Sequence, residues 1–298
     1  MSFITSYTDA EHIIRQHYPQ AQHIEYIDHG HVNFVATVDN AAVFRFPRDA
    51  NAVKRLHYEI ELFKLLQDAI PVVPIPIIIA VNHAPEYAIT NFIPGEHLTG
   101  RQIRCLPQAQ QAAIGHTLAT FIYQFTQRVS AGQLRHIRQK TGVEDIDEPW
   151  DDYFRRMFTP GLPDKRLQPV VDRQYHAWLQ AVAHENRNLA IHDDIHTANV
   201  LFTDNKVSAV LDFGDAYIGS IEEELRGLYR MSDTVVAAAA DQYVRLGGAP
   251  LRLDNVRTWA IANELANFID RTGKGDITHP SYLRAQANLR KWLPDFPL

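Results

Sequence analysis

The sequence predicts an α+β protein of two lobes, a small β-rich N-terminal lobe of residues 1–93 and a larger helical C-terminal lobe of residues 94–298. Short segments of alternating polar and apolar residues, rich in β-branched and aromatic side chains, dominate the first third. Longer segments with apolar residues at a spacing of three and four dominate the remainder. Pro94-Gly95 separates the two regions, and such a pair ends regular structure.

Composition limits the class of protein. A chain of 298 residues with 46% hydrophobic and 21% charged residues can bury one large core or two modest ones. The formal net charge of −6 argues against a surface for nucleic acid or anionic membranes, since both need basic faces. The single cysteine, Cys105, excludes an internal disulfide and fits a reducing compartment, so we expect a cytoplasmic protein. No signal peptide is expected, and no apolar run approaches the ~20 residues that cross a membrane.

The N-terminal lobe is expected to begin with a helix over Thr8–His17, because Thr8 followed by Glu11 is a capping-box pattern. Alternating residues then predict three strands, which are separated by turns at 29–31 and 39–40. The predicted strands are Ile24–Asp28, Val32–Val38 and Ala42–Phe46.

A second helix is predicted over Asn51–Leu66, and it carries a charged residue on its apolar side. Glu59 lies three residues from Leu56 and four from Phe63, so it points along the buried stripe of the helix. A carboxylate there needs a partner, because burying it alone is costly. Arg45, a charged residue among the apolar residues of the third strand, is the expected partner.

Prolines at positions 71, 74 and 76 interrupt the chain before two further strands, Ile77–Val81 and Tyr87–Ile93. Beyond residue 94, apolar residues at helical spacing predict mainly helices. The predicted long helices are Pro107–Arg128, Leu167–His184, Ser232–Leu246 and Leu253–Ile269.

One run, Leu189–Asp215, carries the chemistry. It contains His-Asp-Asp at 192–194, then Asn199, then Asp-Phe-Gly at 212–214. The segments 199–202 and 207–211 are predicted to form a short hairpin, which would bring these polar groups together. Phosphoryl transfer from ATP needs a carboxylate for the proton of the acceptor hydroxyl and oxygen ligands that hold Mg²⁺ on the phosphates. Asp194 has the position of the first group, and Asn199 and Asp212 have those of the second.

Each motif alone is a weak signal, since Asp and Asn commonly cap turns. Their combination at this short separation indicates a phosphotransferase of the kinase type. The run resembles the aminoglycoside phosphotransferase family, also called the choline-kinase-like group of small-molecule kinases. That family has H-G-D-[LIF]-H-x-x-N followed by D-[FW]-x-x-[AG], and here residues 192–199 read HDDIHTAN and residues 212–216 read DFGDA. Two positions depart from the family pattern. Asp193 replaces a Gly, and Glu224 replaces an Asp that tends to brace the catalytic loop.

The resemblance implies a protein-kinase-like fold, with the ATP site in residues 1–93 and the catalytic and acceptor sites in residues 94–298. It implies ATP and Mg²⁺ as cofactors and a hydroxyl-bearing small molecule as acceptor. Asp194 would be the catalytic base, and Asn199 and Asp212 would be the metal ligands. The implied nucleotide-binding residues are Gly30 and Asn33 in a G-x-x-N turn, Arg45 with Glu59 behind it, and Asn91 and Ile93 in the hinge between the lobes.

Several of these residues have a second interpretation. Gly30 also fits an ordinary turn between strands, and residues 91–93 fit a plain domain linker. Arg45 also fits an edge-strand side chain that extends into solvent. The acidic residues between 144 and 152 are typical of a solvated face or of a rim that attracts an amine-bearing acceptor. Glu264, on the last predicted helix, is a candidate for acceptor binding or for the surface.

Two other functions stay open. A metal-dependent hydrolase would use the cluster of His192, Asp193, Asp194 and His196, whose spacing suits metal ligands on one helix face. A catalytically silent, kinase-like binding protein would keep the fold without turnover. A protein kinase fits less well, because no long activation segment follows the Asp-Phe-Gly motif.

Overall fold

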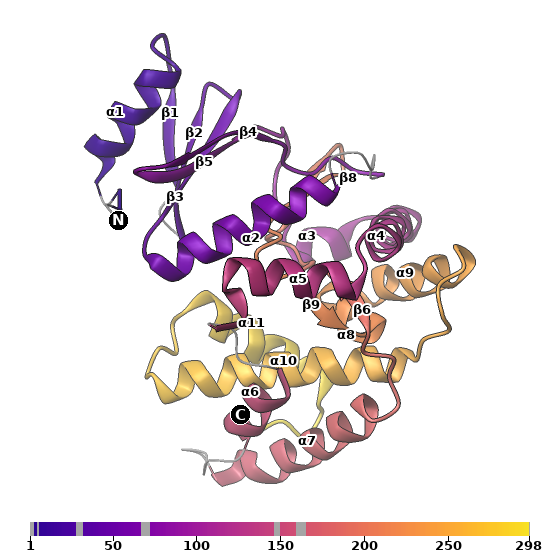
Figure 1. Ribbon diagram of the computed structural model, residues 1–298. Coiled ribbons are helices and arrows are strands. Elements are labelled where there is room, and N and C mark those ends of the chain that lie inside the picture. Colours follow the sequence, from indigo (N-terminus) through magenta and orange to yellow (C-terminus); the bar gives the residue numbers. More distant parts are fainter. Residues whose placement is uncertain are drawn as a thin grey trace.

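The computed structural model describes residues 3–4, 6–27, 32–66, 72–145, 150–158 and 165–297. Within them a β-rich lobe lies above a helical lobe in the view of Figure 1. The fold class predicted from the sequence is therefore confirmed. The elements of the first lobe are α1 (Tyr7–His17), β1 (Ile24–Ile27), β2 (Asn33–Val38), β3 (Ala42–Pro47), α2 (Ala50–Leu66), β4 (Ile78–His83) and β5 (Glu86–Asn91).

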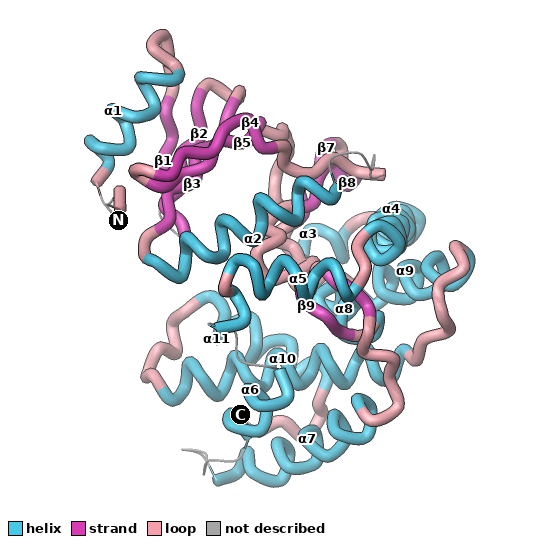
Figure 2. Tube along the Cα trace, in the orientation of Figure 1, coloured by secondary structure: helices cyan, strands magenta, loops and turns pink. Residues whose placement is uncertain are grey.

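The five strands form one antiparallel sheet in the order β1-β2-β3-β5-β4 (Figure 2). Alternation along β3 separates its side chains between the two faces. Phe44 and Phe46 point to the face covered by α1, where they share a core with Ile14. Arg45, between them, therefore points to the opposite face. Helix α2 covers that face, and the small apolar core between α2 and the sheet includes Leu56.

The first helix does not begin as the sequence suggests. Its N-cap is Ser6, whose hydroxyl accepts the N–H of Asp9 at 3.1 Å. The capping box predicted for Thr8 and Glu11 is wrong. Both Ser and Thr are good caps, and Ser6-x-x-Asp9 supplies the same kind of side-chain bond two residues earlier.

The second lobe is built around α10, with α7, α6 and α11 on its sides (Figure 1). Trp178 and Trp259 are fully buried where α7 meets α10, with ring centroids 5.5 Å apart. No helix among the described residues has the length and apolar character needed to cross a membrane. The helices of this lobe are α3 (Gly100–Cys105), α4 (Gln108–Arg128), α5 (Ala131–Thr141), α6 (Trp150–Phe158), α7 (Gln168–Val182), α8 (Ile221–Leu225), α9 (Asp233–Arg245), α10 (Leu253–Gly273) and α11 (Pro280–Trp292), with short 3₁₀ turns η1 (Val143–Asp145), η2 (Lys165–Leu167) and η3 (Arg226–Arg230).

Two short antiparallel pairs position the catalytic run. β6 (Leu189–Ile191) pairs with β9 (Tyr217–Gly219), and β7 (Val200–Thr203) pairs with β8 (Lys206–Val210). The predicted hairpin is confirmed as β7–β8. The residues at 192–199 form the loop before this hairpin, and those at 212–216 form the loop after it.

Helix α2 contacts both lobes. Its apolar residues Tyr58, Leu62 and Phe63 belong to the large core of the helical lobe. The Tyr58 hydroxyl donates a hydrogen bond to the carbonyl of Ala216 at 2.6 Å, and the buried Arg138 of α5 donates to the same carbonyl at 3.2 Å. The helix that carries Glu59 is thus bonded directly to the segment that follows Asp-Phe-Gly.

Candidate active site

The loop between β6 and β7 orients Asp194 through the side chain of Asn199. The amide nitrogen of Asn199 donates to Asp194 Oδ2 at 2.6 Å and to the Asp194 carbonyl at 3.0 Å. The N–H of Leu211 donates to the carbonyl of Asn199 at 2.8 Å and joins the two loops. With its nitrogen engaged, the amide group of Asn199 has its oxygen left to serve as a ligand.

Two histidines complete this loop. His196 Nδ1 accepts the N–H of Ala198 at 3.1 Å, so its Nε2 carries the hydrogen and lies 3.1 Å from Asp194 Oδ1. His192 Nδ1 accepts the N–H of Asp194 at 3.4 Å, and its Nε2 donates to the carbonyl of Leu211 at 3.1 Å. Burial lowers the pKa of His192 to about 4, so its ring stays neutral at pH 7.

Asp194 itself is ionised. Burial opposes its charge, but His196 and the more distant Arg230 outweigh burial and lower the pKa of Asp194 to about 2. A carboxylate of such low pKa is a weak base. It can still orient a hydroxyl and accept its proton late, because phosphoryl transfer passes through a loose transition state.

The backbone conformation at Asp193 suits a glycine, the residue expected at this position, and contacts of the Asp193 side chain and N–H stabilise it in this chain. Its φ is +69°, a left-handed conformation that costs most residues about 1–2 kcal/mol and that Asp tolerates better. Three groups hold it. Glu224 Oε2 accepts its N–H at 2.7 Å, Trp150 Nε1 donates to its carboxylate at 3.0 Å, and Arg226 forms a buried ion pair with it. Glu224 thus bonds to the catalytic loop, the bracing position that the resemblance implies.

The ion pair predicted between Arg45 and Glu59 is present and buried at the Glu59 end. Glu59 Oε2 pairs with Arg45, while Oε1 accepts the N–H of Phe213 at 3.0 Å. Burial opposes the charge of Arg45, but Glu59 and Asp212 outweigh it and raise the pKa of Arg45. Arg45 does not extend from an edge strand, because β3 is the central strand of the sheet.

Asp212 is the exposed carboxylate next to this pair. Its φ is +60°, which turns the chain sharply where β8 ends and leads into the Asp-Phe-Gly motif. The Asp212 carboxylate and the Asn199 amide oxygen are hard oxygen donors, the kind that Mg²⁺ takes together with phosphate oxygens. The residues present therefore fit a magnesium ion.

Besides Arg45, three of the predicted nucleotide residues lie in or next to the sheet. Asn33 is buried on the same face as Arg45, and its amide oxygen has no hydrogen-bond partner among the described residues. Asn91 bonds to Ile77 through both its N–H, at 3.1 Å, and its side-chain oxygen, at 2.7 Å. Ile93 follows in the connection to the second lobe. Gly30 lies outside the described residues.

A cavity of about 510 Å³ opens beside Asp194 on the side of the helical lobe. Its lining is rich in paired charges. Arg55 bonds to Asp215 at 3.0 Å, and Arg226 pairs with Asp193. Sequence reasoning missed these arginines, because a single Arg in a loop or helix carries no spacing signal. The charged residues of the lining are Arg55, Arg226, Arg230, Arg284, Asp193, Asp194 and Asp215, with His196 beside them.

Glu264, considered above for acceptor binding, is buried with its charge neutralised. Its Oε1 accepts from Arg230 at 2.9 Å, from Arg284 at 3.3 Å and from Asn288 at 3.1 Å. Burial opposes its ionisation, but the two arginines outweigh burial and lower its pKa. The acidic run at 144–152 falls partly outside the described residues.

The hydrolase interpretation does not fit this geometry. Both ring nitrogens of His192 are engaged with the backbone, and the Asp193 carboxylate is bonded to Arg226 and Trp150. Within the described residues, this cluster does not form a group of side chains converging on a common point where a metal could bind.

A model of the phosphotransferase enzyme family matches residues 23–263. A search of curated protein sequences found no match.

Solved structures with the same fold include aminoglycoside and macrolide phosphotransferases. The GDP complex of aminoglycoside 2'-phosphotransferase-IIIa has a TM-score of 0.73 at 16% identity, covering 98% of this chain and 100% of that one. The streptomycin-ATP-APH(2")-IIa ternary complex has a TM-score of 0.67 at 14% identity, covering 97% of each chain. The macrolide 2'-phosphotransferase MphH from Brachybacterium faecium has a TM-score of 0.63 at 17% identity, covering 97% of this chain and 100% of that one.

Proposed function

The chain belongs to the phosphotransferase enzyme family, and on that premise we propose that it transfers the γ-phosphoryl group of ATP to a hydroxyl group of a small molecule. The observation that carries the proposal is the convergence of two loops and a strand. Asp194 lies in the loop before the β7–β8 hairpin, where its Oδ2 accepts a hydrogen bond from the Asn199 amide nitrogen at 2.6 Å. Asp212 lies in the loop after the hairpin. Arg45, oriented by Glu59, faces Asp212 from the sheet.

Each residue then has a task that its contacts support. Asn199 and Asp212 would hold Mg²⁺, which neutralises charge on the phosphates. Arg45 would bind phosphate oxygens, since its guanidinium offers several donors and Glu59 fixes its direction. Asp194 would orient the acceptor hydroxyl and take its proton. Asn33 is buried on the same face of the sheet as Arg45, and its amide nitrogen would donate to a phosphate oxygen. The backbone around Ile93 would bind the base.

The charges that line the 510 Å³ cavity beside Asp194 favour a neutral or anionic acceptor. They do not favour a polyamine. Asp193 and Asp215 are already paired with arginines, and Asp194 is needed for the reaction. Arg230 and Arg284 share the single carboxylate of Glu264, so one positive charge is left in excess, and the partly exposed Arg284 can offer it to an incoming ligand. A carboxylate or phosphate on a polyol would be attracted to such a site.

The deciding experiment is a screen for ATP and GTP consumption across hydroxylated small molecules. The panel would contain aminoglycosides, macrolides, amino alcohols, neutral sugars and sugar acids or sugar phosphates. We expect Mg²⁺-dependent turnover with one class, lost in Asp194→Asn. ATP binding without turnover on any acceptor would support the silent binding protein instead. Turnover restricted to polyamines would contradict the charge argument while leaving the phosphotransferase proposal intact.

A further inference from the structure

A second cluster of ligand-type side chains lies on the N-terminal lobe, away from the catalytic loops. His57 of α2 and the pair His83 and Glu86 at the β4–β5 turn direct their ligand atoms toward one another, all within 4.8 Å. His57 Nε2 lies 3.2 Å and His83 Nδ1 lies 3.4 Å from the same oxygen, Oε2 of Glu86. Within the described residues, this is the set of histidine, cysteine and carboxylate groups that meets such a geometry.

The spacing of these atoms suits a tetrahedral transition metal. Zn²⁺ binds imidazole nitrogen and carboxylate oxygen at about 2.0–2.2 Å, so neighbouring ligand atoms lie roughly 3.3–3.5 Å apart on the edges of the tetrahedron. The two separations from Glu86 Oε2, 3.2 and 3.4 Å, are close to that length, and the ligand atoms of the two histidines lie within 4.8 Å of each other. Little side-chain movement is therefore needed to admit the ion.

The frame behind the ligands is rigid. His83 and Glu86 are directly opposite each other in the β4–β5 ladder. The turn between them is fastened by Asn82, whose side chain donates to the carbonyl of Pro85 at 2.6 Å. His57 projects from the middle of a helix of 17 residues. Ligands on a helix and a hairpin are held more precisely than ligands on loops.

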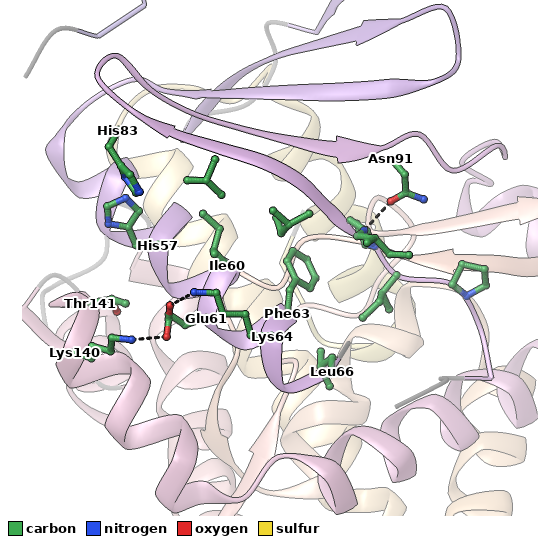
Figure 3. Close-up of a pocket in the computed structure, with 16 residues that line it drawn as sticks. His57, Ile60, Glu61, Phe63, Lys64, Leu66, His83, Asn91, Lys140 and Thr141 are labelled. Carbon is green, nitrogen blue, oxygen red and sulfur yellow. Dashed lines mark hydrogen bonds and ion pairs between the residues drawn. The ribbon is translucent and has the colours of Figure 1, made fainter. Parts of the chain in front are cut away.

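Burial and access also agree with metal binding. Glu86 is 7% exposed, and a buried carboxylate requires a cation or hydrogen-bond donors. His83 is 70% and His57 is 34% exposed, so an ion can reach the three atoms from solvent. Figure 3 shows the two rings near each other at one end of a pocket of about 740 Å³, which gives water access to a fourth coordination position.

We propose that His57, His83 and Glu86 form a Zn²⁺ site with an open fourth position. The site is separate from the magnesium ligands Asn199 and Asp212 and does not depend on the proposed reaction. Because His57 belongs to α2 while the other two ligands belong to the β4–β5 turn, the bound ion fastens this helix to the sheet.

The experiment is a titration of the apo protein, freed of metal by chelation, with Zn²⁺ by calorimetry and with Co²⁺ by visible absorption. Asp212→Asn is the background that weakens the catalytic metal site. We expect one strongly bound Zn²⁺ in the wild type and in Asp212→Asn, with the intense Co²⁺ bands of a four-coordinate site. Zn²⁺ should also raise the Tm of both proteins, since it binds only the folded state.

His83→Ala and Glu86→Gln are the test variants, and His184→Ala, an exposed histidine on the other lobe, is the matched control. Each test variant should weaken Zn²⁺ binding by about 100-fold or more, because even changes behind a ligand cost 10–100-fold. The control should bind as the wild type does. His83 is largely exposed, so its variant keeps the fold, which circular dichroism checks. Absence of Zn²⁺ binding by the wild type, or equal binding by His83→Ala, overturns the proposal.

Discussion

Glu59 and Phe213 connect the helix beside the sheet to the Asp-Phe-Gly motif of the other lobe. The carboxylate oxygen Oε1 of Glu59 accepts the backbone N–H of Phe213 at 3.0 Å, while Oε2 pairs with Arg45. One buried side chain therefore sets both the direction of Arg45 and the position of the residue after Asp212. Arg45 and Asp212, the proposed phosphate-binding cation and metal ligand, are therefore coupled through it.

The first prediction concerns this coupling. Arg45→Ala should raise the KM for ATP by about 10–100-fold, because a hydrogen bond to a charged group contributes about 1.5–3 kcal/mol. Glu59→Ala should cause part of the same loss, and the double variant should lose less than the sum, with a coupling energy between about 0.5 and 3 kcal/mol. Steady-state kinetics on the two single variants and the double variant measures this coupling energy. Strictly additive losses would contradict the pairing. An unaffected Arg45→Ala would direct attention to another cation, first of all Arg48, which directly follows β3.

Glu59→Gln separates the two roles of Glu59. The amide keeps an acceptor for the Phe213 N–H and removes the charge that faces Arg45. We expect this variant to keep more activity than Glu59→Ala if the bond to Phe213 contributes to the site. Equal losses would assign the whole effect to the ion pair.

Asp194→Asn should keep the fold and nucleotide binding and lose kcat by about 10²–10⁴-fold, the usual contribution of a positioned proton acceptor. Calorimetry with ATP and a turnover assay measure the two parts. Asp204→Asn, in the exposed turn of the β7–β8 hairpin, is the matched control and should behave as the wild type. Wild-type kcat in Asp194→Asn would remove this carboxylate from the mechanism.

Asp212→Asn should abolish most of the Mg²⁺-dependent gain in ATP affinity and leave metal-free binding unchanged. Asn is the correct substitution because φ at this position is +60°, a conformation that Asn adopts readily and Ala does not. The change thus weakens a metal ligand without straining the backbone. Titrations with ATP in the presence of Mg²⁺ or of a chelator compare the two affinities. An unchanged Mg²⁺ effect would mean that the metal is held elsewhere.

The last prediction concerns pH. Burial raises the pKa of Glu224 to about 8, above its ordinary 4.5. The proton on this carboxyl therefore stabilises the folded protein fully below pH 4.5, and the stabilisation is lost as pH rises through 8. Glu224→Gln keeps an oxygen for the Asp193 N–H and cannot ionise. Its free energy of unfolding should exceed that of the wild type by an amount that grows by a few kcal/mol from pH 5 to pH 9 in denaturant titrations. A constant difference would show that Glu224 does not titrate in this window.

The sequence was most informative where residue spacing itself fixes geometry. Glu59 on the apolar stripe of its helix led to Arg45 as partner, and the pair is present. The hairpin between Asn199 and Asp212 followed from alternation and turn residues. The backbone conformation of Asp193 could not be predicted from the sequence. It depends on Glu224, Trp150 and Arg226, which are far from Asp193 in sequence.

The helix α5 marks another limit. The polar composition of residues 128–150 obscured it, although Ser130 and Gln133 form a capping box and Gly142 ends the helix at a φ of +72°. These local signals were present in the sequence. The role of Arg138, whose guanidinium reaches the carbonyl of Ala216, depends on tertiary packing and was not predictable from spacing. The lobe boundary at residues 93 and 94 stays a prediction.

The two hydrogen bonds from Tyr58 and Arg138 to Ala216 have a consequence for how the sheet can move relative to the helical lobe. The bond from Tyr58 fastens α2 to the segment that follows Asp-Phe-Gly. The sheet meets α2 through the apolar contact of Leu56, Ile60 and Ala88 and through the buried ion pair of Glu59 with Arg45. A movement of the five strands over α2 would therefore have to break this ion pair, which opposes such a movement.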